Sequence, residues 1–318
     1  MLAGILGVSP WQAFAQASKA VRRIGVLYPG SPLTPADKQY FSDPLRELGW
    51  VEGRNIHIEW RYANNKAEAL QVLTEELVRA NVEVIVTNGT NAALAAKRAT
   101  TIIPIVFAAA DPVQFGLVAS LARPGGNITG YSQAKPETSA KYLSLLKELV
   151  PSIRRVALLE HSANPFYRAT RGQFADSCRL LAMEPVFVEI SAANEIEDAI
   201  SRLPRQGVEA LVLRGDVFLY EHRFEIGSAA LKHRVPTMTE IPDLVREAGI
   251  LVSYATAGNE ENRRLASYVD RILRGAKPAD LPVEQPSKFE LVINFKTAHA
   301  LGLTIPKELL LRADEVIQ

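Results

Sequence analysis

Apolar runs of strand length alternate with helical patterns along most of the chain. A short β-branched run at residues 23–28 ends in Pro29-Gly30-Ser31-Pro32, which is typical of a buried parallel strand closed by a turn. Phe41, Leu45 and Leu48 then recur at helical spacing before Gly49. Further strands are expected at residues 55–62, 82–86 and 102–107, and further helices at 70–78, at 91–100 and from Asp111-Pro112 to Pro124. This βαβα repetition predicts a parallel sheet with helices on both faces.

The same alternation starts again in the second part of the chain. Helices are expected at residues 139–149, 166–181, 195–203 and 223–233, and strands at 155–159, 186–189, 210–214, 235–237 and 250–253. An amphipathic helix at 260–273, an extended proline-rich stretch at 278–286 and a strand at 289–294 follow. Two similar α/β halves are therefore expected in one chain.

Composition excludes several classes of protein. Of the 318 residues, 47% are hydrophobic and 22% are charged, which is typical of a globular chain rather than a disordered one. The 36 Lys and Arg residues nearly balance the 35 Asp and Glu residues, so no excess field attracts nucleic acid or an anionic membrane. Cys178 is the single cysteine and cannot form an internal disulfide. We expect a small-molecule ligand and no nucleic-acid partner.

Sequence motifs for common chemistry are missing. The sequence has no glycine-rich nucleotide loop, and the histidines at 57, 161, 222, 233 and 299 lack zinc-site spacing. Gly130-Tyr131-Ser132-Gln133-Ala134 comes nearest to a hydrolase nucleophile elbow, but alanine replaces its last glycine. A cofactor-independent racemase uses two cysteines as acid and base, and this chain has one. We therefore expect no cofactor, no metal site and no catalytic residues.

The first twenty residues resemble a targeting segment. An apolar stretch, Leu2 to Val8, precedes the small-x-small patterns Ala13-Phe14-Ala15 and Ala15-Gln16-Ala17, which suit a signal peptidase, although a basic start is missing. We interpret residues 1–21 as a signal-peptide remnant and expect a periplasmic or otherwise exported protein. The alternative is a short amphipathic helix that packs on the domain. No later run reaches the roughly 18 apolar residues of a membrane span.

Ligands of parallel α/β sheets bind outside the carboxyl ends of the strands, where loops and helix N-termini converge. Thr87-Asn88-Gly89-Thr90-Asn91 follows a strand and offers backbone N–H groups, hydroxyls and amides that suit a carboxylate or phosphate. Ordinary helix capping by Thr90 or Asn91 explains only part of this set. At the end of the next strand, Ala108-Ala109-Ala110 offers a surface of small side chains. Asp111 is expected to cap a helix ahead of Pro112.

Other strand-end loops carry candidate polar groups. Tyr28-Pro29-Gly30-Ser31 offers an aromatic wall and a hydroxyl, or is simply a turn. In the second half, His161-Ser162-Ala163-Asn164-Pro165 occupies the corresponding place. Asp216 and Glu240 follow two further strands, and such acids could hold an ammonium group while the first half holds a carboxylate. The expected ligand is therefore zwitterionic. The aromatic residues near these loops make a flat or apolar ligand group plausible: Tyr28, Phe107, Phe115, Phe166 and Phe218.

Two segments carry a family resemblance. Asp111-Pro112-Val113 with residues 116–130 (GLVASLARPGGNITG), and residues 281–294 (LPVEQPSKFELVIN), closely resemble the TrpX-like family of ABC-transporter substrate-binding proteins. The resemblance implies two Rossmann-like lobes with parallel sheets, a cleft between them, and delivery of a solute to an ABC permease in the membrane. Characterised members include aromatic amino-acid binders. The resemblance places the ligand at the strand-end loops, here Ser31, 88–90, 109–111, 162–164, Asp216 and Glu240.

The implied architecture sets the remaining expectations. The chain is expected to cross between lobes near residues 131–134, 254–258 and 282–287, which makes a three-strand hinge that permits closure. The expected N-terminal lobe is 22–132 plus 257–283, and the C-terminal lobe is 133–256 plus 284–318. Tyr254 is placed to cover an apolar ligand group or to pack in the hinge. A monomer is expected. The ligand-binding candidates are Tyr28, Ser31, Asn88, Gly89, Thr90, Ala109, Asp111, Ser162, Asn164, Asp216, Glu240 and Tyr254.

Two other classes of protein remain as alternatives. A ligand-sensing domain of a regulatory protein has this fold, but such proteins normally carry a DNA-binding helix-turn-helix ahead of it, and the first twenty residues cannot build one. A two-lobed enzyme needs an acid, a base or a nucleophile within reach of one another, and no such pair stands out.

Overall fold

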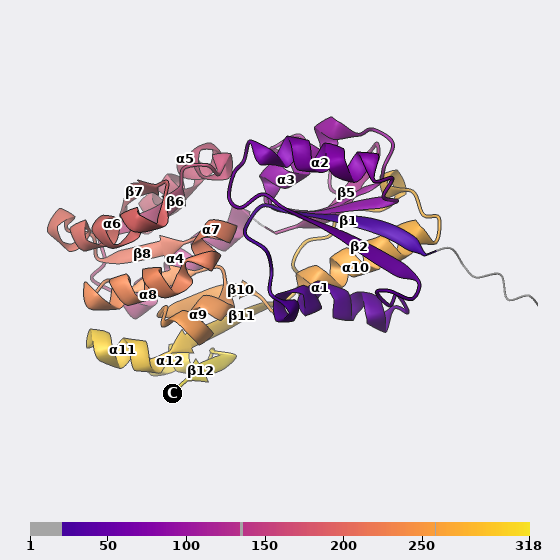
Figure 1. Ribbon diagram of the computed structural model, residues 1–318. Coiled ribbons are helices and arrows are strands. Elements are labelled where there is room, and N and C mark those ends of the chain that lie inside the picture. The colour runs from indigo at the N-terminus through magenta and orange to yellow at the C-terminus, as the bar shows by residue number, and fades with distance from the viewer. Residues whose placement is uncertain (1–20, 134–135, 258) are drawn as a thin grey trace, which may run out of the picture.

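The computed structural model describes residues 21–133, 136–257 and 259–318, and these form two α/β lobes (Figure 1). Residues 1–20, which hold nearly all of the expected signal remnant, lie outside the described residues. The first lobe contains a parallel sheet in the order β2-β1-β3-β4-β5. Its strands are β1 (Arg22–Tyr28), β2 (Ile56–Tyr62), β3 (Val84–Asn88), β4 (Ile105–Ala109) and β5 (Ile128–Ser132).

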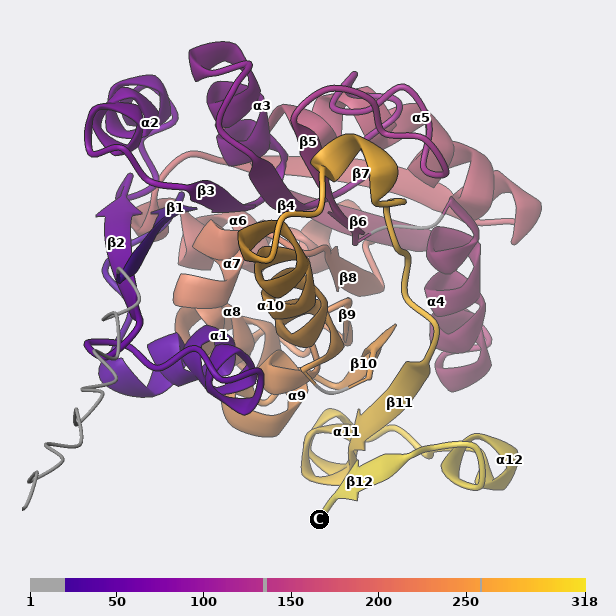
Figure 2. The same cartoon turned by 90° about the vertical axis from the view of Figure 1, so that its right-hand side faces the viewer.

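Helices cover both faces of this N-terminal sheet. They are α1 (Pro35–Glu47), α2 (Ala69–Arg79), α3 (Thr90–Ala99) and α10 (Glu260–Leu273). Apolar residues of α1 and α10 share one core with Ile24 and Val86, whereas α2 and α3 share another with Leu27 and Ile85. This division follows from strand alternation, because neighbouring side chains point to opposite faces. Figure 2 shows α10, which comes late in the chain, lying beside α1 within this lobe.

The second lobe contains the sheet β12-β11-β10-β9-β8-β6-β7. Its strands are β6 (Arg155–His161), β7 (Glu184–Ile190), β8 (Ala210–Leu213), β9 (Thr237–Thr239), β10 (Val252–Thr256), β11 (Phe289–Asn294) and β12 (Glu315–Ile317). Its helices are α4 (Pro136–Leu149), α5 (Pro165–Leu180), α6 (Ile196–Arg202), α7 (Val217–Glu221), α8 (Arg223–Lys232), α9 (Pro242–Ala248), α11 (Phe295–Leu301) and α12 (Lys307–Leu310). Helices α4 and α5 pack together, and α8 packs against α6 and α9.

The chain passes between the two lobes at three places: between β5 and α4, between β10 and α10, and between the 3₁₀ turn Pro278–Asp280 and β11 (Figure 1). The expected pair of parallel-sheet lobes joined by three crossings is therefore the architecture of this protein. One local difference is that β10 and β11 pair antiparallel, since the chain leaves the second lobe after β10 and re-enters it at β11.

The helix expected to begin at Asp111 is absent from the described residues. Residues 112–116 form turns instead. Asp111 accepts a hydrogen bond from the Gln114 backbone N–H at 3.2 Å, as a cap would. Its φ is +39°, however, whereas a capping residue is normally extended, and the positive φ of Gly116 (65°) ends the turn after a few residues. The expected capping of a helix by Asp111 is therefore wrong.

Several short elements lack a strong sequence pattern. Hydrophobic periodicity does not predict α7, α9, α11, α12 or β12. Each of these elements is seven residues or shorter, which is too few to show a helical or alternating period. The tail after residue 294 adds β12 beside β11, parallel to it, and so extends the second sheet.

Gly227 allows α8 and α9 to pack closely, because a Cβ there would overlap Ala248 O and lie 3.0 Å from Ala248 C. These are backbone atoms, which cannot rotate away. We expect Gly227→Ala to lower the free energy of unfolding by about 1–3 kcal/mol, measured by urea denaturation. Gly172→Ala is the control, since an added Cβ on this exposed part of α5 meets nothing within 4 Å. Equal midpoints for the two variants would contradict the prediction.

Candidate ligand-binding cleft

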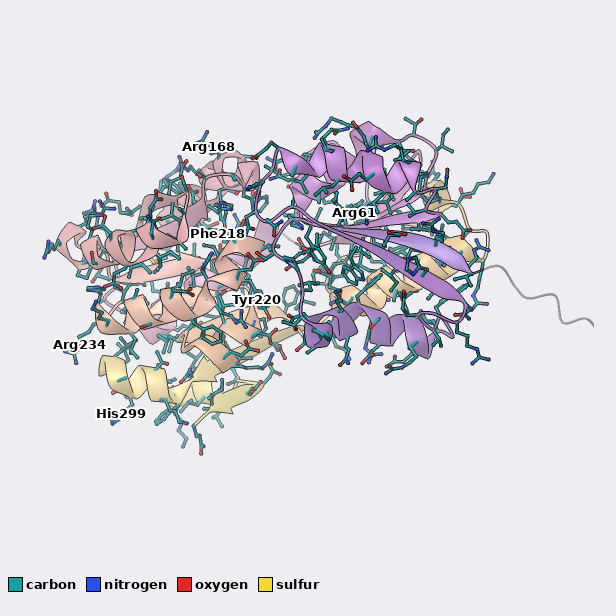
Figure 3. All side chains as sticks on the ribbon, viewed as in Figure 1. Arg61, Arg168, Phe218, Tyr220, Arg234 and His299 are labelled. Carbon is teal, nitrogen blue, oxygen red and sulfur yellow. The ribbon has the colours of Figure 1, made fainter. Side chains whose placement is uncertain are left out.

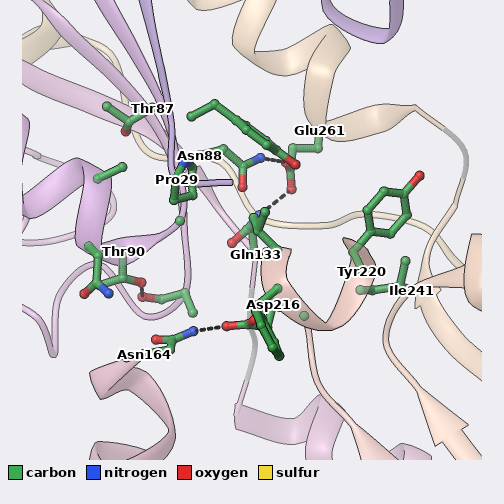
Figure 4. Close-up of a pocket in the computed structure, with 18 of the residues that line it drawn as sticks. Pro29, Thr87, Asn88, Thr90, Gln133, Asn164, Asp216, Tyr220, Ile241 and Glu261 are labelled. Carbon is green, nitrogen blue, oxygen red and sulfur yellow. Dashed lines mark hydrogen bonds between the residues drawn. The ribbon is translucent and has the colours of Figure 1, made fainter. Parts of the chain in front are cut away.

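A cavity of about 670 Å³ lies between the lobes. Its lining comes from the carboxyl ends of β1, β3, β6, β8 and β9, from α1 and from the start of α10. The cavity is within the size range of small-molecule sites. Figure 4 shows polar side chains of the two lobes facing each other across it. The two sheets thus direct their strand-end loops into one shared space, as expected for parallel α/β sheets.

The N-terminus of α3 opens into this cleft. Gly89 precedes the helix with φ of 84°, and no side chain of the described residues caps the helix start. Thr90 lines the cleft, and its hydroxyl makes only a long 3.4 Å bond to Ala110 O. Thr87 Oγ1 is buried and has no hydrogen-bond partner among the described residues. Backbone N–H groups at such a helix end, with a positive dipole end and two hydroxyls nearby, suit an anionic group.

Glu261 is an acid of the cleft that the strand-end pattern did not predict. It lies in the first turn of α10, where its Oε1 accepts a hydrogen bond from Asn88 Nδ2 at 3.0 Å and its Oε2 accepts one from Gln133 Nε2 at 2.9 Å (Figure 4). None of the ion pairs found between the described residues includes Glu261. Burial raises the pKa of this carboxyl group, and the two amide donors act in the opposite direction. Glu261 therefore presents a carboxylate to the cleft without a cationic partner among the described residues.

The polar side chains of the C-terminal wall hold each other in place. Asn164 Oδ1 accepts a bond from the Phe166 N–H and so caps α5, while its Nδ2 donates to Asp216 Oδ2 at 2.7 Å. Asp216 Oδ1 accepts a bond from the Leu219 N–H and caps α7. His161 Nδ1 lies 3.7 Å from Asp216 Oδ1, and burial lowers the pKa of this imidazole against the opposing effect of Asp216. These polar groups have partners within their own lobe.

Glu240 has a similar arrangement. Its carboxylate accepts a bond from the Gly215 N–H at 3.2 Å and lies 3.6 Å from Nε of the buried Arg214. The guanidinium of Arg214 also lies 4.4 Å from the centre of the Phe166 ring. Of the cleft acids, Glu240 is thus compensated by a cation of its own lobe, in contrast to Glu261.

Aromatic rings form much of the remaining lining, from both lobes: Tyr28, Tyr40, Phe41, Trp60, Phe166, Phe218 and Tyr220. Tyr220 projects from α7 toward the N-terminal lobe (Figure 3), and burial raises the pKa of its hydroxyl to about 12. Burial also raises the pKa of the Tyr28 hydroxyl. Both phenols therefore stay neutral at physiological pH. Such a lining suits a flat, apolar ligand group.

Comparison with known proteins places this architecture in a family. Residues 32–317 match the family model described as ABC transporter substrate binding protein. The chain belongs to this family. It is 27% identical to the tyrosine-binding protein of Clostridioides difficile (strain R20291), over 95% of this chain and 91% of that protein. Members of the family bind a small-molecule substrate and work with an ABC transporter.

Two solved structures are similar over nearly the whole chain. One is the ABC domain of Streptococcus pneumoniae in complex with L-Trp, with a TM-score of 0.84 and 26% identity, covering 94% of this chain and 100% of that chain. The other is a conserved domain protein from Vibrio cholerae, with a TM-score of 0.86 and 25% identity, covering 93% of this chain and 99% of that chain. The two-lobed fold of this substrate-binding protein is therefore shared with both.

The structure separates the residues expected from the sequence into two groups. Those that line the cleft are Tyr28, Asn88, Gly89, Thr90, Asn164, Asp216 and Glu240. Those outside the lining are Ser31, Ala109, Asp111, Ser162 and Tyr254. Ligand contact by any of them stays a prediction.

The residues outside the lining have other neighbours. Ala109 is fully buried in β4, and Ala110 reaches the cleft instead. Ser162 Oγ lies 2.9 Å from Ser191 Oγ at the end of β7. The Tyr254 ring stacks on Phe289 at 5.3 Å, beside the hinge. Of the aromatic residues noted in the sequence, Phe107 lies in the core of the first lobe.

The described part of the chain lacks two further features. No group of three or more His, Cys, Asp or Glu side chains there could hold a metal ion. None of the helices in residues 21–133, 136–257 and 259–318 combines the length and the apolar character needed to cross a bilayer.

The raised pKa of Glu261 predicts a pH-dependent stability difference. The folded protein binds the proton of this group more tightly than the unfolded chain does, so the contribution of Glu261 to stability is greatest below its unfolded pKa of about 4.3 and declines as pH rises through the folded pKa. We expect the wild type to lose stability relative to Glu261→Gln over that pH range, measured by urea denaturation at a series of pH values. A difference that stays constant with pH would contradict this prediction.

Proposed function

We propose that this substrate-binding protein captures a zwitterionic amino acid with an aromatic side chain in the interlobe cleft and delivers it to a membrane permease. The observation that carries the proposal is the position of Glu261. Its unneutralised carboxylate is hydrogen-bonded to Asn88, which directly precedes Gly89 at the uncapped start of α3. A receptor for an ammonium group and a receptor for a carboxylate therefore lie next to each other.

The α3 N-terminus is the proposed carboxylate receptor. Backbone N–H groups there carry a partial positive charge, and the hydroxyls of Thr87 and Thr90 can donate to the same anion. This agrees with the role that the sequence suggested for the loop at residues 87–91.

Glu261 is the proposed ammonium receptor. A carboxylate that is partly desolvated and lacks a cationic partner gains most from a ligand that supplies the positive charge. The sequence assigned this role to Asp216 and Glu240, but both have partners in their own lobe. We assign to them the shaping of the C-terminal wall.

The aromatic lining is the proposed receptor for the ligand side chain. Tyr28 and Trp60 in the first lobe and Phe218 and Tyr220 in the second all face the same cavity. A planar ring between such walls buries much of its apolar surface on closure. The relatives point the same way, because one is named for tyrosine binding and another was solved with L-Trp.

Three further features belong to the proposal. The protein binds its ligand without transforming it, which is supported by the family and by His161, whose imidazole is fixed between Asp216 and the Phe218 ring. It acts as a monomer, since both walls of the cleft come from one chain. It is exported, which is supported by the pattern of residues 1–20 and by the family.

Calorimetric titration tests the role of Glu261. Wild-type protein is titrated with L-tyrosine, L-tryptophan and 3-(4-hydroxyphenyl)propionate, which lacks the ammonium group. We expect the propionate to bind about 10-fold to 100-fold more weakly than tyrosine, because one charge-assisted contact is lost. Glu261→Gln is expected to weaken tyrosine binding by a similar factor and to change propionate binding little.

The control for this titration is Glu308→Gln, on exposed α12 and away from the cleft. It is expected to bind tyrosine as the wild type does. Two results would overturn the proposal: a wild type that binds neither tyrosine nor tryptophan, or a Glu261→Gln variant that binds tyrosine with unchanged affinity.

A further inference from the structure

At the rim of the cleft, the two lobes touch through a glycine. Gly30 lies in the loop after β1, and a Cβ at this position would overlap Glu221 Oε1 and lie 2.5 Å from Val217 Cγ1, both in the other lobe. Its φ is not in the left-handed region, so alanine fits the backbone. The third close neighbour of an added Cβ is the edge of the Tyr28 ring, at 2.9 Å within its own lobe. The absence of a side chain at residue 30 is therefore what permits this approach of the lobes.

Glu221 uses the close approach to accept hydrogen bonds from the opposite lobe. Ser31 donates its backbone N–H at 2.6 Å and its hydroxyl at 3.3 Å, and Asn65 Nδ2 donates at 2.6 Å. All of these donors belong to the N-terminal lobe, whereas Glu221 ends α7 in the C-terminal lobe. We call Gly30, Ser31, Asn65 and Glu221 the rim contact.

The rim contact adjoins the cleft wall. Helix α7 begins at the Asp216 cap and carries Phe218 and Tyr220, which line the cleft, before it ends at Glu221. Asn65 lines the cleft as well, and Tyr28 is two residues from Gly30. A ligand that orders these side chains therefore acts on the same short segments that form the rim contact.

We propose that Gly30 and Glu221 are positioning residues that hold the two lobes closed over the ligand. Hydrogen bonds to an ionised carboxylate are among the stronger ones in proteins, and they form here only when the lobes meet. Their free energy adds to that of ligand binding in the closed state alone, so they slow dissociation. This inference rests on the proposed capture of a ligand between the lobes, and it adds residues that need not touch the ligand.

The first test measures closure without any ligand. Asn91 and Ala163 meet across the cleft, with Asn91 Nδ2 at 3.2 Å from Ala163 O, so the double variant Asn91→Cys/Ala163→Cys reports lobe contact through the rate of coupling by a short bis-maleimide. The native Cys178 is buried and does not compete. Addition of Gly30→Ala or Glu221→Ala is expected to slow coupling by about tenfold.

Matched control variants distinguish an effect on lobe closure from a general loss of stability. Gly172→Ala adds a methyl group to an exposed part of α5, and Glu225→Ala removes an acid four residues from Glu221 whose ion pair, to His222, stays within its own lobe. Both are expected to leave the coupling rate unchanged. The ligand-free melting temperature of Gly30→Ala, measured by calorimetry, should stay near that of the wild type, since the closest clashes of the added methyl group are with the opposite lobe, and its close neighbour in its own lobe is the edge of the Tyr28 ring, a side chain that can shift.

The second test uses L-tyrosine as the probe. Gly30→Ala and Glu221→Ala are expected to raise the Kd by about tenfold, mainly through faster dissociation, and to keep a larger radius of gyration at saturation in small-angle scattering. If the wild type binds neither tyrosine nor tryptophan, the proposed function is wrong. The role of the rim contact is then tested by the coupling rates alone. Coupling rates that Gly30→Ala and Glu221→Ala leave unchanged would overturn the inference.

Discussion

Both sheets direct the carboxyl ends of their parallel strands toward the same gap, and the site depends on this constraint. Parallel strands gather loops and helix N-termini at one edge of a sheet. Three crossings of the chain bring two such edges face to face. Every polar group discussed for ligand binding is located at one of these edges or at the start of α10, which the second crossing delivers. The topology of the chain therefore determines where the cleft forms, and particular side chains determine what it can bind.

The two walls of the cleft use their polar groups differently. In the C-terminal wall Asn164 and Asp216 cap α5 and α7 and bond to each other, which leaves that wall internally satisfied. In the N-terminal wall, among the described residues, the start of α3 lacks a side-chain cap and Glu261 accepts its hydrogen bonds from the amides of Asn88 and Gln133. Unsatisfied donors and an unneutralised carboxylate cost stability when they are partly buried. Proteins commonly carry such a cost where a ligand repays it.

Periodicity and turn chemistry predicted the alternating α/β halves and several cleft residues, because these depend on local patterns, whereas the three crossings were expected from the family resemblance. Asn88, Gly89 and Thr90 were found because they follow a buried strand directly. Glu261 was missed because it follows a crossing rather than a strand, although the adjacent pair Glu260-Glu261 at the start of an amphipathic helix was a usable signal. Asp111 shows the opposite error, since Asp-Pro predicted a helix where positive φ values at Asp111 and Gly116 make turns. The contact between Gly30 and Glu221 joins residues far apart in sequence, and no local pattern encodes it.

The hydrogen bonds among the crossing segments restrict how the lobes can move. Residue 284 is bonded to the end of β5, just before the first crossing, through Glu284 N to Gly130 O and Ser132 N to Glu284 O. A few residues later, Ala257 N bonds to Lys288 O, which continues the antiparallel β10–β11 ladder. The third segment is thus hydrogen-bonded at both ends to different neighbours, and between these bonds the Ser287 hydroxyl donates to Glu260 Oε1 at 2.9 Å in the first turn of α10. Because hydrogen bonds join the crossing segments to one another, these segments are expected to bend together as one unit when the lobes move relative to each other.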